Sequence, residues 1–251
     1  MALRCGKVLV TGGSQGAGFA IAQRLCEEGA LVTITAKHKV NLDAALELLP
    51  KGQAFGLLMD IEDTDRFASV CESAAAMMNG LDCLINNAGS PPNPFLEVGF
   101  GVFDTTEETW GKVLDKNLRG SFFMAKTFVW HLLNHNQMFG SSEVRYLGDI
   151  INISSDLTMI EGAYSIAESG VNALTETWAR WLEKYGIIVN GVAGRQSDSA
   201  RGSTVYHLRD MNTEGRFDTG DEVAGVVAFL LQESSINIQG QTIICNGKYQ
   251  Y

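Results

Sequence analysis

The sequence predicts an α/β fold: a single doubly wound domain spanning residues 1–251, with a parallel sheet flanked by helices. Short apolar segments alternate with helical segments along the whole chain, which is typical of a parallel sheet covered on both faces. The chain has no internal repeat and no linker rich in proline or charge. Its 251 residues are enough to bury one sizeable core, so one domain is the simplest interpretation.

Each element is expected from its apolar pattern. Strands are expected at the short apolar segments 7–11, 31–35, 53–59, 83–86, 150–154, 187–192 and 242–245. Helices are expected at the longer periodic segments 16–28, 64–78, 106–133, 164–185 and 221–231. The stretches 90–104, 137–147 and 195–219 have no clear period. We expect 195–219 to be a mobile lid over the substrate, because irregular segments of this length are usually functional.

Composition and charge exclude several classes of function. A net charge of −10 argues against a general nucleic-acid surface, and no apolar run reaches the length of a membrane span. The five cysteines are scattered, as expected for reduced thiols. The N-terminal residues lead into the first strand without the apolar h-region of a signal peptide. We therefore expect a cytoplasmic protein whose partners include neither nucleic acid nor a membrane.

A glycine-rich turn joins the first strand to the first helix. It reads Thr-Gly-Gly-Ser-Gln-Gly-Ala-Gly over residues 11–18 and includes Gly12, Ser14, Gly16 and Gly18. Glycines at such a turn let the backbone approach a pyrophosphate, whose charge is favoured by the N-terminus of the following helix. The turn thus predicts a dinucleotide site in a Rossmann-type fold. A packing turn without a ligand remains the alternative on this segment alone.

Further motifs follow the turn in a fixed order. Asn-Asn-Ala-Gly stands at 86–89 and Asn117 in the long helix; Asn-Ile-Ser-Ser at 152–155 and Tyr164 come next. Gly-Ile-Ile-Val-Asn and Gly-Gln-Thr-Ile complete the series at 186–190 and 240–243. In this order the chain resembles the classical short-chain dehydrogenase/reductase (SDR) family over nearly its whole length. The resemblance implies an oxidoreductase that interconverts ketones and alcohols with NAD(P)(H).

The resemblance also implies roles for matching residues. Asp60 and Ile61 would contact adenine, and Asn117 would organise a water that relays protons. Ser155 would hold the substrate oxygen, and Tyr164 would transfer the proton. The full set of expected cofactor-binding residues is Gly12, Ser14, Gly16, Gly18, Lys37, Asp60, Ile61, Asn87 and Gly89.

The end of the second strand bears on the choice of cofactor. Ala36 stands where an acidic residue would accept hydrogen bonds from the ribose 2′-hydroxyl of NAD. Lys37 follows and could pair with the 2′-phosphate of NADP, so the preference leans towards NADP(H). A solvated basic loop is the alternative interpretation. NAD and a complete loss of binding both stay open.

Glu168 is the main departure from the family pattern. It stands four residues after Tyr164, where the family has a lysine that orients the ribose and lowers the pKa of the tyrosine. A carboxylate there has the opposite effect, since it disfavours the tyrosinate. A difference of roughly two or three pKa units would cost about a hundredfold or more in available base. The pattern continues without a gap to the glycine at 186, so a shifted alignment does not recover the lysine.

Three other departures lie near the same place. Ser155 is nine residues before Tyr164, a segment shorter than usual in the family, and we expect Ser155 to be displaced. Gly194 has no proline before it, where the family has Pro-Gly, and Cys-Asn-Gly-Lys at 245–248 replaces Asp-Gly-Gly. These changes all affect the nicotinamide side, while the adenine side is left intact.

Two weaker signals concern the long helices. His131 and His135 are four residues apart, a spacing that can hold a metal, but no carboxylate motif accompanies them. We therefore expect an exposed helix end and no metal site. Four tryptophans fall on the two long helices, which favours a buried oligomer interface; they are Trp110, Trp130, Trp178 and Trp181.

Three hypotheses follow. The first is an SDR-fold subunit with impaired or absent catalysis, which assembles with an active SDR paralogue in a heteromeric hydroxyacyl/ketoacyl dehydrogenase. The second is an active NAD(P)(H)-dependent oxidoreductase with an unusual relay through Tyr164 and Glu168. The third is a homo-oligomeric protein that binds a dinucleotide without turning it over.

Overall fold

The computed structural model describes residues 3–89, 105–138, 145–155, 162–194 and 220–245. Within these residues one parallel sheet runs in the order β3-β2-β1-β4-β5-β6-β7. Its strands are β1 (Lys7–Val10), β2 (Leu31–Ala36), β3 (Ala54–Leu58), β4 (Cys83–Asn86), β5 (Gly148–Ser155), β6 (Ile187–Gly194) and β7 (Thr242–Cys245). The predicted α/β fold with a parallel sheet flanked by helices is confirmed. The strand order reverses between β1 and β4, the position at which open α/β sheets bind ligands.

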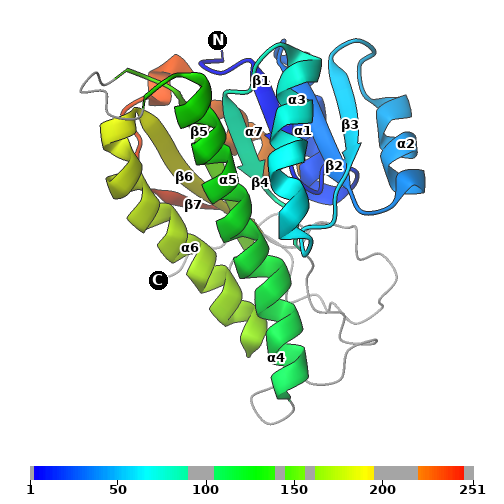
Figure 1. The fold of residues 1–251 in the computed structure, drawn as a ribbon, viewed down its shortest axis with the longest axis vertical. Helices are drawn as coiled ribbons and strands as arrows, with labels where there is room; N and C mark the ends of the chain where they lie inside the picture. The colour runs from blue at the N-terminus through cyan, green and yellow to red at the C-terminus, as the bar shows by residue number, and fades with distance from the viewer. Residues whose placement is uncertain (1–2, 90–104, 139–144, 156–161, 195–219, 246–251) are drawn as a thin grey trace.

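Helices cover both faces of the sheet (Figure 1). On one face lie α1 (Gly16–Glu27), α2 (Lys39–Leu48) and α7 (Gly220–Leu230). On the other lie α3 (Phe67–Met78), α5 (Gly120–His135) and α6 (Ala163–Leu182). Successive side chains of β1 point to opposite faces of the sheet. Val8 and Val10 pack on the face covered by α1, and Leu9 packs on the face covered by α3. All three are fully buried, as expected for a strand covered on both faces.

The expected helix 106–133 is present, but one of its turns is widened. It consists of α4 (Glu107–Leu114), the π turn η2 (Asp115–Arg119) and α5, which follow one another without a break. Thr106 caps the start, because its side chain accepts a hydrogen bond from the backbone of Thr109. Single π turns occur frequently at functional sites, and this one carries Asn117.

Two expectations about helices are wrong. The apolar pattern predicts no helix at 39–48, where the structure has α2. That helix buries only Leu42 and Ala45, so its apolar period is weak. The two histidines of α5 do not both lie at an exposed helix end, since His131 is buried against α3. None of the helices in the described ranges is long and apolar enough to cross a bilayer.

Candidate cofactor and catalytic site

The glycine-rich turn between β1 and α1 requires glycine for steric reasons. Gly12 and Gly16 have φ of +65° and +56°, a region that side chains rarely adopt. A Cβ on Gly18 would lie 2.5 Å from the carbonyl oxygen of Gly12 and would also collide with the amide of Asn87. Asn87 braces the turn by donating to the carbonyls of Thr11 (2.9 Å) and Gly12 (3.1 Å). The turn is therefore a rigid backbone cradle.

The N-terminus of α1 opens onto a cavity of about 410 Å³. Gln15 is the N-cap residue, and its side chain makes no capping hydrogen bond within the described part of the chain. The first turn also contains no acidic residue. Unpaired N–H groups and the helix dipole thus favour an anion here. Ser14, Gly16 and Gly18 line the same cavity, so the residues present fit the pyrophosphate of a dinucleotide.

Strand β2 also holds the glycine-rich turn by hydrogen bonds. Thr35 accepts hydrogen bonds from the backbone N–H groups of Gly12 (3.2 Å, at its hydroxyl) and Gly13 (3.0 Å, at its carbonyl). Gly13 has no room for a Cβ, which would lie 2.6 Å from a methyl carbon of Ile34. Sequence reasoning missed Thr35, whose only signal is a polar residue near the end of an apolar strand.

Lys37 is already partnered by acidic side chains. Its ammonium lies 2.6 Å from Asp60 and 3.7 Å from Glu62, and about half of its side chain is exposed. The hydrogen bond to Asp60 raises the pKa of Lys37. Burial raises the pKa of Asp60, but the Lys37 ammonium, the backbone N–H of Glu62 and the Lys116 charge together hold that pKa below its usual value. A 2′-phosphate at this place would have to compete with two carboxylates for Lys37.

The asparagine network links the turn after β4 to the π turn. Asn86 donates to the carbonyl of Ser121 (2.7 Å) and to the side chain of Asn152 (3.2 Å). The Asn117 amide donates to the carbonyl of Val113 (3.0 Å). A Cβ on Gly89 would lie 2.6 Å from the Asn117 side-chain oxygen. Asn117 therefore sits directly against the backbone that follows β4.

Ser155 and Tyr164 meet in the structure. Their hydroxyl oxygens are 2.7 Å apart, with Ser155 at the end of β5 and Tyr164 in the first turn of α6. The expectation that the short segment between them displaces Ser155 is wrong. The segment 156–161 itself lies outside the described residues. The hydroxyl pair has the geometry needed to hold and protonate a carbonyl oxygen.

Glu168 points back towards the same pair. Its carboxylate accepts a 2.8 Å hydrogen bond from the backbone N–H of Ser155 and also a hydrogen bond from Tyr164. The side chain is almost fully buried. Burial raises the pKa of Glu168 to about 7, and the two hydrogen bonds only partly offset that effect. Near neutral pH the group thus exists in both neutral and charged forms, and neither form supplies a positive charge.

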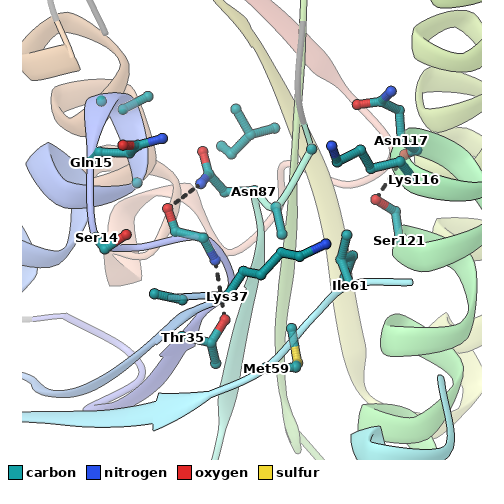
Figure 2. A pocket seen from close by; sticks show the side chains of 18 of the residues that line it. Ser14, Gln15, Thr35, Lys37, Met59, Ile61, Asn87, Lys116, Asn117 and Ser121 are labelled. Carbon is teal, nitrogen blue, oxygen red and sulfur yellow. Dashed lines mark hydrogen bonds between the residues drawn. The ribbon is translucent and has the colours of Figure 1, made fainter. Parts of the chain in front are cut away.

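The cavity brings together the predicted cofactor-binding and catalytic residues, although they are far apart in the sequence. Its lining includes the glycine turn, Lys37, Asp60, Ile61, Asn87, Gly89, Asn117, Ser155, Tyr164 and Glu168. Figure 2 shows Lys37 and Lys116 reaching into the pocket from opposite sides. Lys116 was not identified from the sequence, because it reads as an ordinary polar helix residue before Asn117. The expected lid at 195–219 and the residues 246–248 lie outside the described residues.

A parallel sheet with a glycine cradle at its switch point and a Ser–Tyr pair at the end of β5 defines a dinucleotide-binding oxidoreductase fold. The family model described as short chain dehydrogenase matches residues 6–202. The chain belongs to the short-chain dehydrogenase family.

Individual relatives match over nearly the full length. The chain is 30% identical over 251 residues to 3-oxoacyl-[acyl-carrier-protein] reductase FabG of Staphylococcus aureus, covering 95% of this chain and 96% of that one. It is 28% identical to dehydrogenase/reductase SDR family member 4 of the mouse, covering 95% and 85%. The crystal structure of a short chain dehydrogenase from Bacillus anthracis superposes with a TM-score of 0.81 at 29% identity, covering all of both chains.

Proposed function

We propose that this chain is a dinucleotide-binding SDR subunit whose own proton transfer is impaired by Glu168, and that it assembles with an active SDR chain. The observation that carries the proposal is the buried carboxylate beside the Ser155–Tyr164 pair. The proposed complex is a heteromeric hydroxyacyl/ketoacyl dehydrogenase, in which the partner supplies catalysis.

Dinucleotide binding is supported by the fit of the residues at the cradle. The positive φ at Gly12 and Gly16 and the uncapped start of α1 suit a pyrophosphate. Bound NAD(P)(H) would supply the hydride chemistry, while the residues of this chain hold its phosphates and ribose. Neutral Glu168 can still donate a hydrogen bond to a ribose hydroxyl, so binding persists where proton transfer is impaired. NADP(H) is the preferred form, since Lys37 and Lys116 are both cations at the pocket.

The impairment of proton transfer follows from the charge of the residue at position 168. The proton donor of a carbonyl reduction must become a tyrosinate transiently, and a positive neighbour stabilises that anion. In the carboxylate form Glu168 opposes it. In the neutral form it gives only a hydrogen bond, so Tyr164 lacks electrostatic help at any pH.

Assembly is supported by exposed aromatic side chains. Trp110, Trp130 and Trp181 are 39%, 51% and 69% exposed in the single chain, and they lie on α4, α5 and α6 (Figure 1). Trp178 is partly buried and makes an edge contact with Phe122. Large exposed aromatic residues are enriched at protein interfaces. We infer that this helix layer contacts another subunit.

Native mass spectrometry of the complex from its own cells tests the proposal. We expect this chain with a second, different SDR chain and bound dinucleotide, and the purified chain alone should turn over 3-oxoacyl thioesters slowly or not at all. Finding only homo-oligomers in the native complex would contradict the heteromeric assembly.

A second function is favoured by the 2.7 Å contact between Ser155 and Tyr164. With that pair in place, the chain could be an active NAD(P)(H)-dependent reductase of ketones that uses a Tyr164/Glu168 relay. The name of the Staphylococcus relative makes 3-oxoacyl thioesters the first substrates to assay. Turnover that disappears in Tyr164→Phe, without loss of cofactor binding, would establish this alternative.

A further inference from the structure

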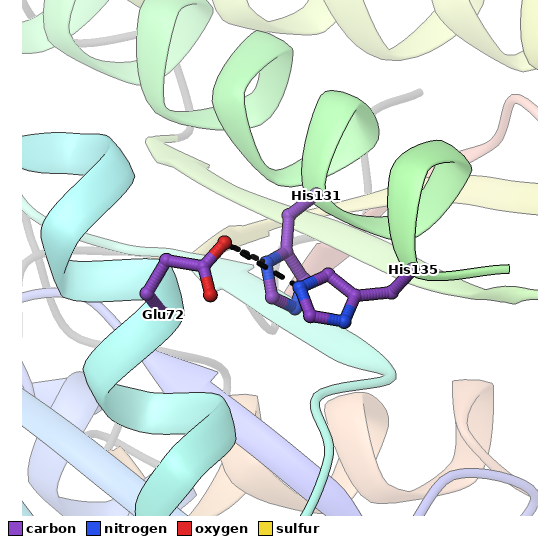
Figure 3. A group of neighbouring side chains, drawn as sticks. All are labelled: Glu72, His131 and His135. Carbon is purple, nitrogen blue, oxygen red and sulfur yellow. Dashed lines mark hydrogen bonds and ion pairs between the residues drawn. The ribbon is translucent and has the colours of Figure 1, made fainter. Parts of the chain in front are cut away.

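A cluster of two histidines and a glutamate lies on the surface between α3 and α5, and Figure 3 shows the three side chains converging. His131 and His135 are one helical turn apart on α5, and Glu72 reaches them from α3. The ligand atoms of all three lie within 4.8 Å of one another. None of the three lines the dinucleotide cavity, so the cluster is separate from the site proposed above.

The spacing of the cluster fits a metal better than it fits hydrogen bonding. His131 Nδ1 and His135 Nε2 lie 3.3 Å and 3.4 Å from the same oxygen, Glu72 Oε1. Good N–H···O hydrogen bonds are about 2.7–3.2 Å long, so both contacts are long. In a tetrahedral zinc site with bonds of about 2.0–2.1 Å, neighbouring ligand atoms are about 3.4 Å apart. Two of the three ligand separations therefore already have the tetrahedral value.

The side chains are arranged so that an ion can enter. His131 is almost fully buried and held in place, whereas His135 and Glu72 are more than half exposed. The centroids of the two imidazole rings are 4.2 Å apart, and the ring planes are tilted by 37°.

We propose that Glu72, His131 and His135 bind a divalent transition-metal ion, with Zn²⁺ as the best-fitting ion, between α3 and α5. Two imidazole nitrogens and one carboxylate oxygen suit zinc, copper or nickel, whereas magnesium and calcium prefer sites made mainly of oxygen ligands. Three protein ligands leave a fourth position for water. Because the ligands come from two helices, the ion ties α3 to α5 and stabilises the folded chain in proportion to its occupancy.

The test is a Zn²⁺ titration by calorimetry of the full chain, after removal of any affinity tag and treatment with a chelator. We expect one Zn²⁺ per chain and a melting temperature that rises with Zn²⁺ concentration. Even an outer hydrogen-bond partner of a metal ligand is worth about 10- to 100-fold in affinity, so His135→Ala and Glu72→Gln should each weaken binding by about 100-fold or more. Both residues are exposed, so these variants should fold.

His38→Ala is the matched control, because His38 lies at the start of α2, away from the cluster. It should leave Zn²⁺ binding unchanged. Undetectable Zn²⁺ binding, or binding that His135→Ala and Glu72→Gln leave unaltered, would overturn the assignment. A rise in melting temperature of equal size with Mg²⁺ would overturn the role of the imidazoles.

Discussion

The two halves of the pocket are formed by different kinds of chemical group. On the β1–β2 side the cradle is made of backbone: Gly12 and Gly18 have no room for side chains, and Thr35 and Asn87 bind main-chain groups. On the β5–α6 side the site consists of three side chains, Ser155, Tyr164 and Glu168. One substitution can change the charge of the second half without disturbing the first. We therefore expect cofactor binding and proton transfer to be separable in this chain.

The largest effect is expected from restoring the positive charge. Glu168→Lys should raise 3-oxoacyl thioester reduction by the purified chain about a hundredfold or more, since roughly two units in the tyrosine pKa correspond to that factor. Glu168→Gln is the control, because it removes the negative charge without adding a positive one. Steady-state assays with NADPH measure both. Equal rates in the two variants would show that charge is not what limits this half of the site.

A pH effect on stability should follow from the same carboxyl group. Its pKa in the folded chain is about 7, raised by burial above the ordinary value of about 4.5. The folded state therefore binds more protons than the unfolded state between these values, and stability falls as pH rises from about 4.5 to about 7. The total loss is about 3 kcal/mol at about 1.4 kcal/mol per unit.

Glu168→Gln removes this titration. Its free energy of unfolding, relative to that of the original chain, should increase by about 3 kcal/mol between pH 4.5 and pH 8. Urea unfolding of both chains at the two pH values measures the difference, in which the other titrating groups cancel. A difference that stays constant with pH would mean that Glu168 titrates normally.

One added methyl group is expected to disrupt the half of the pocket that is formed by main-chain groups. Gly18→Ala should abolish NADPH binding and lower stability by about 1–3 kcal/mol, because the new Cβ meets the Gly12 carbonyl and the Asn87 amide. Gly111→Ala is the matched control: it lies in α4 with nothing within 4 Å, and should be neutral or stabilising by up to about 1 kcal/mol. Calorimetry with NADPH and thermal melting distinguish the two. Normal NADPH binding by Gly18→Ala would contradict the cradle.

The smallest effect is expected at Lys37. Its ion pairs with Asp60 and Glu62 are exposed, and such pairs are worth about 0–1 kcal/mol. Lys37→Gln should weaken NADPH binding about fivefold at most and leave NADH binding unchanged. Parallel titrations with the two cofactors measure the ratio. A larger loss of affinity for NADH than for NADPH would show that Lys37 does not bind the 2′-phosphate.

The features that could be predicted from the sequence are those that depend on a short local pattern of residues. The strands β4 and β7 begin and end at the expected residues, since buried parallel strands are short apolar runs between polar turns. The glycine cradle was recognised because its conformation demands glycine. Helix α2 was missed because only Leu42 and Ala45 are buried there.

Contacts between distant segments could not be predicted in the same way. The meeting of Ser155 with Tyr164 depends on how β5 and α6 pack, and counting residues between them led to the wrong expectation. Glu72 is 59 residues from His131 in sequence, so only the packing of α3 on α5 reveals that they are neighbours. Lys116 reaches the pocket from the π turn, whose presence the apolar pattern did not indicate.

The hydrogen bond from the Ser155 backbone to Glu168 has a consequence for any chain with lysine at this position. A lysine at 168 could not accept that bond, and leaving the part-buried N–H of Ser155 unpaired costs at most about 1–3 kcal/mol. If the proposed function holds, Glu168→Lys would thus gain proton transfer and lose stability in the same step. The carboxylate at 168 therefore couples the stability of the end of β5 to the charge beside Tyr164.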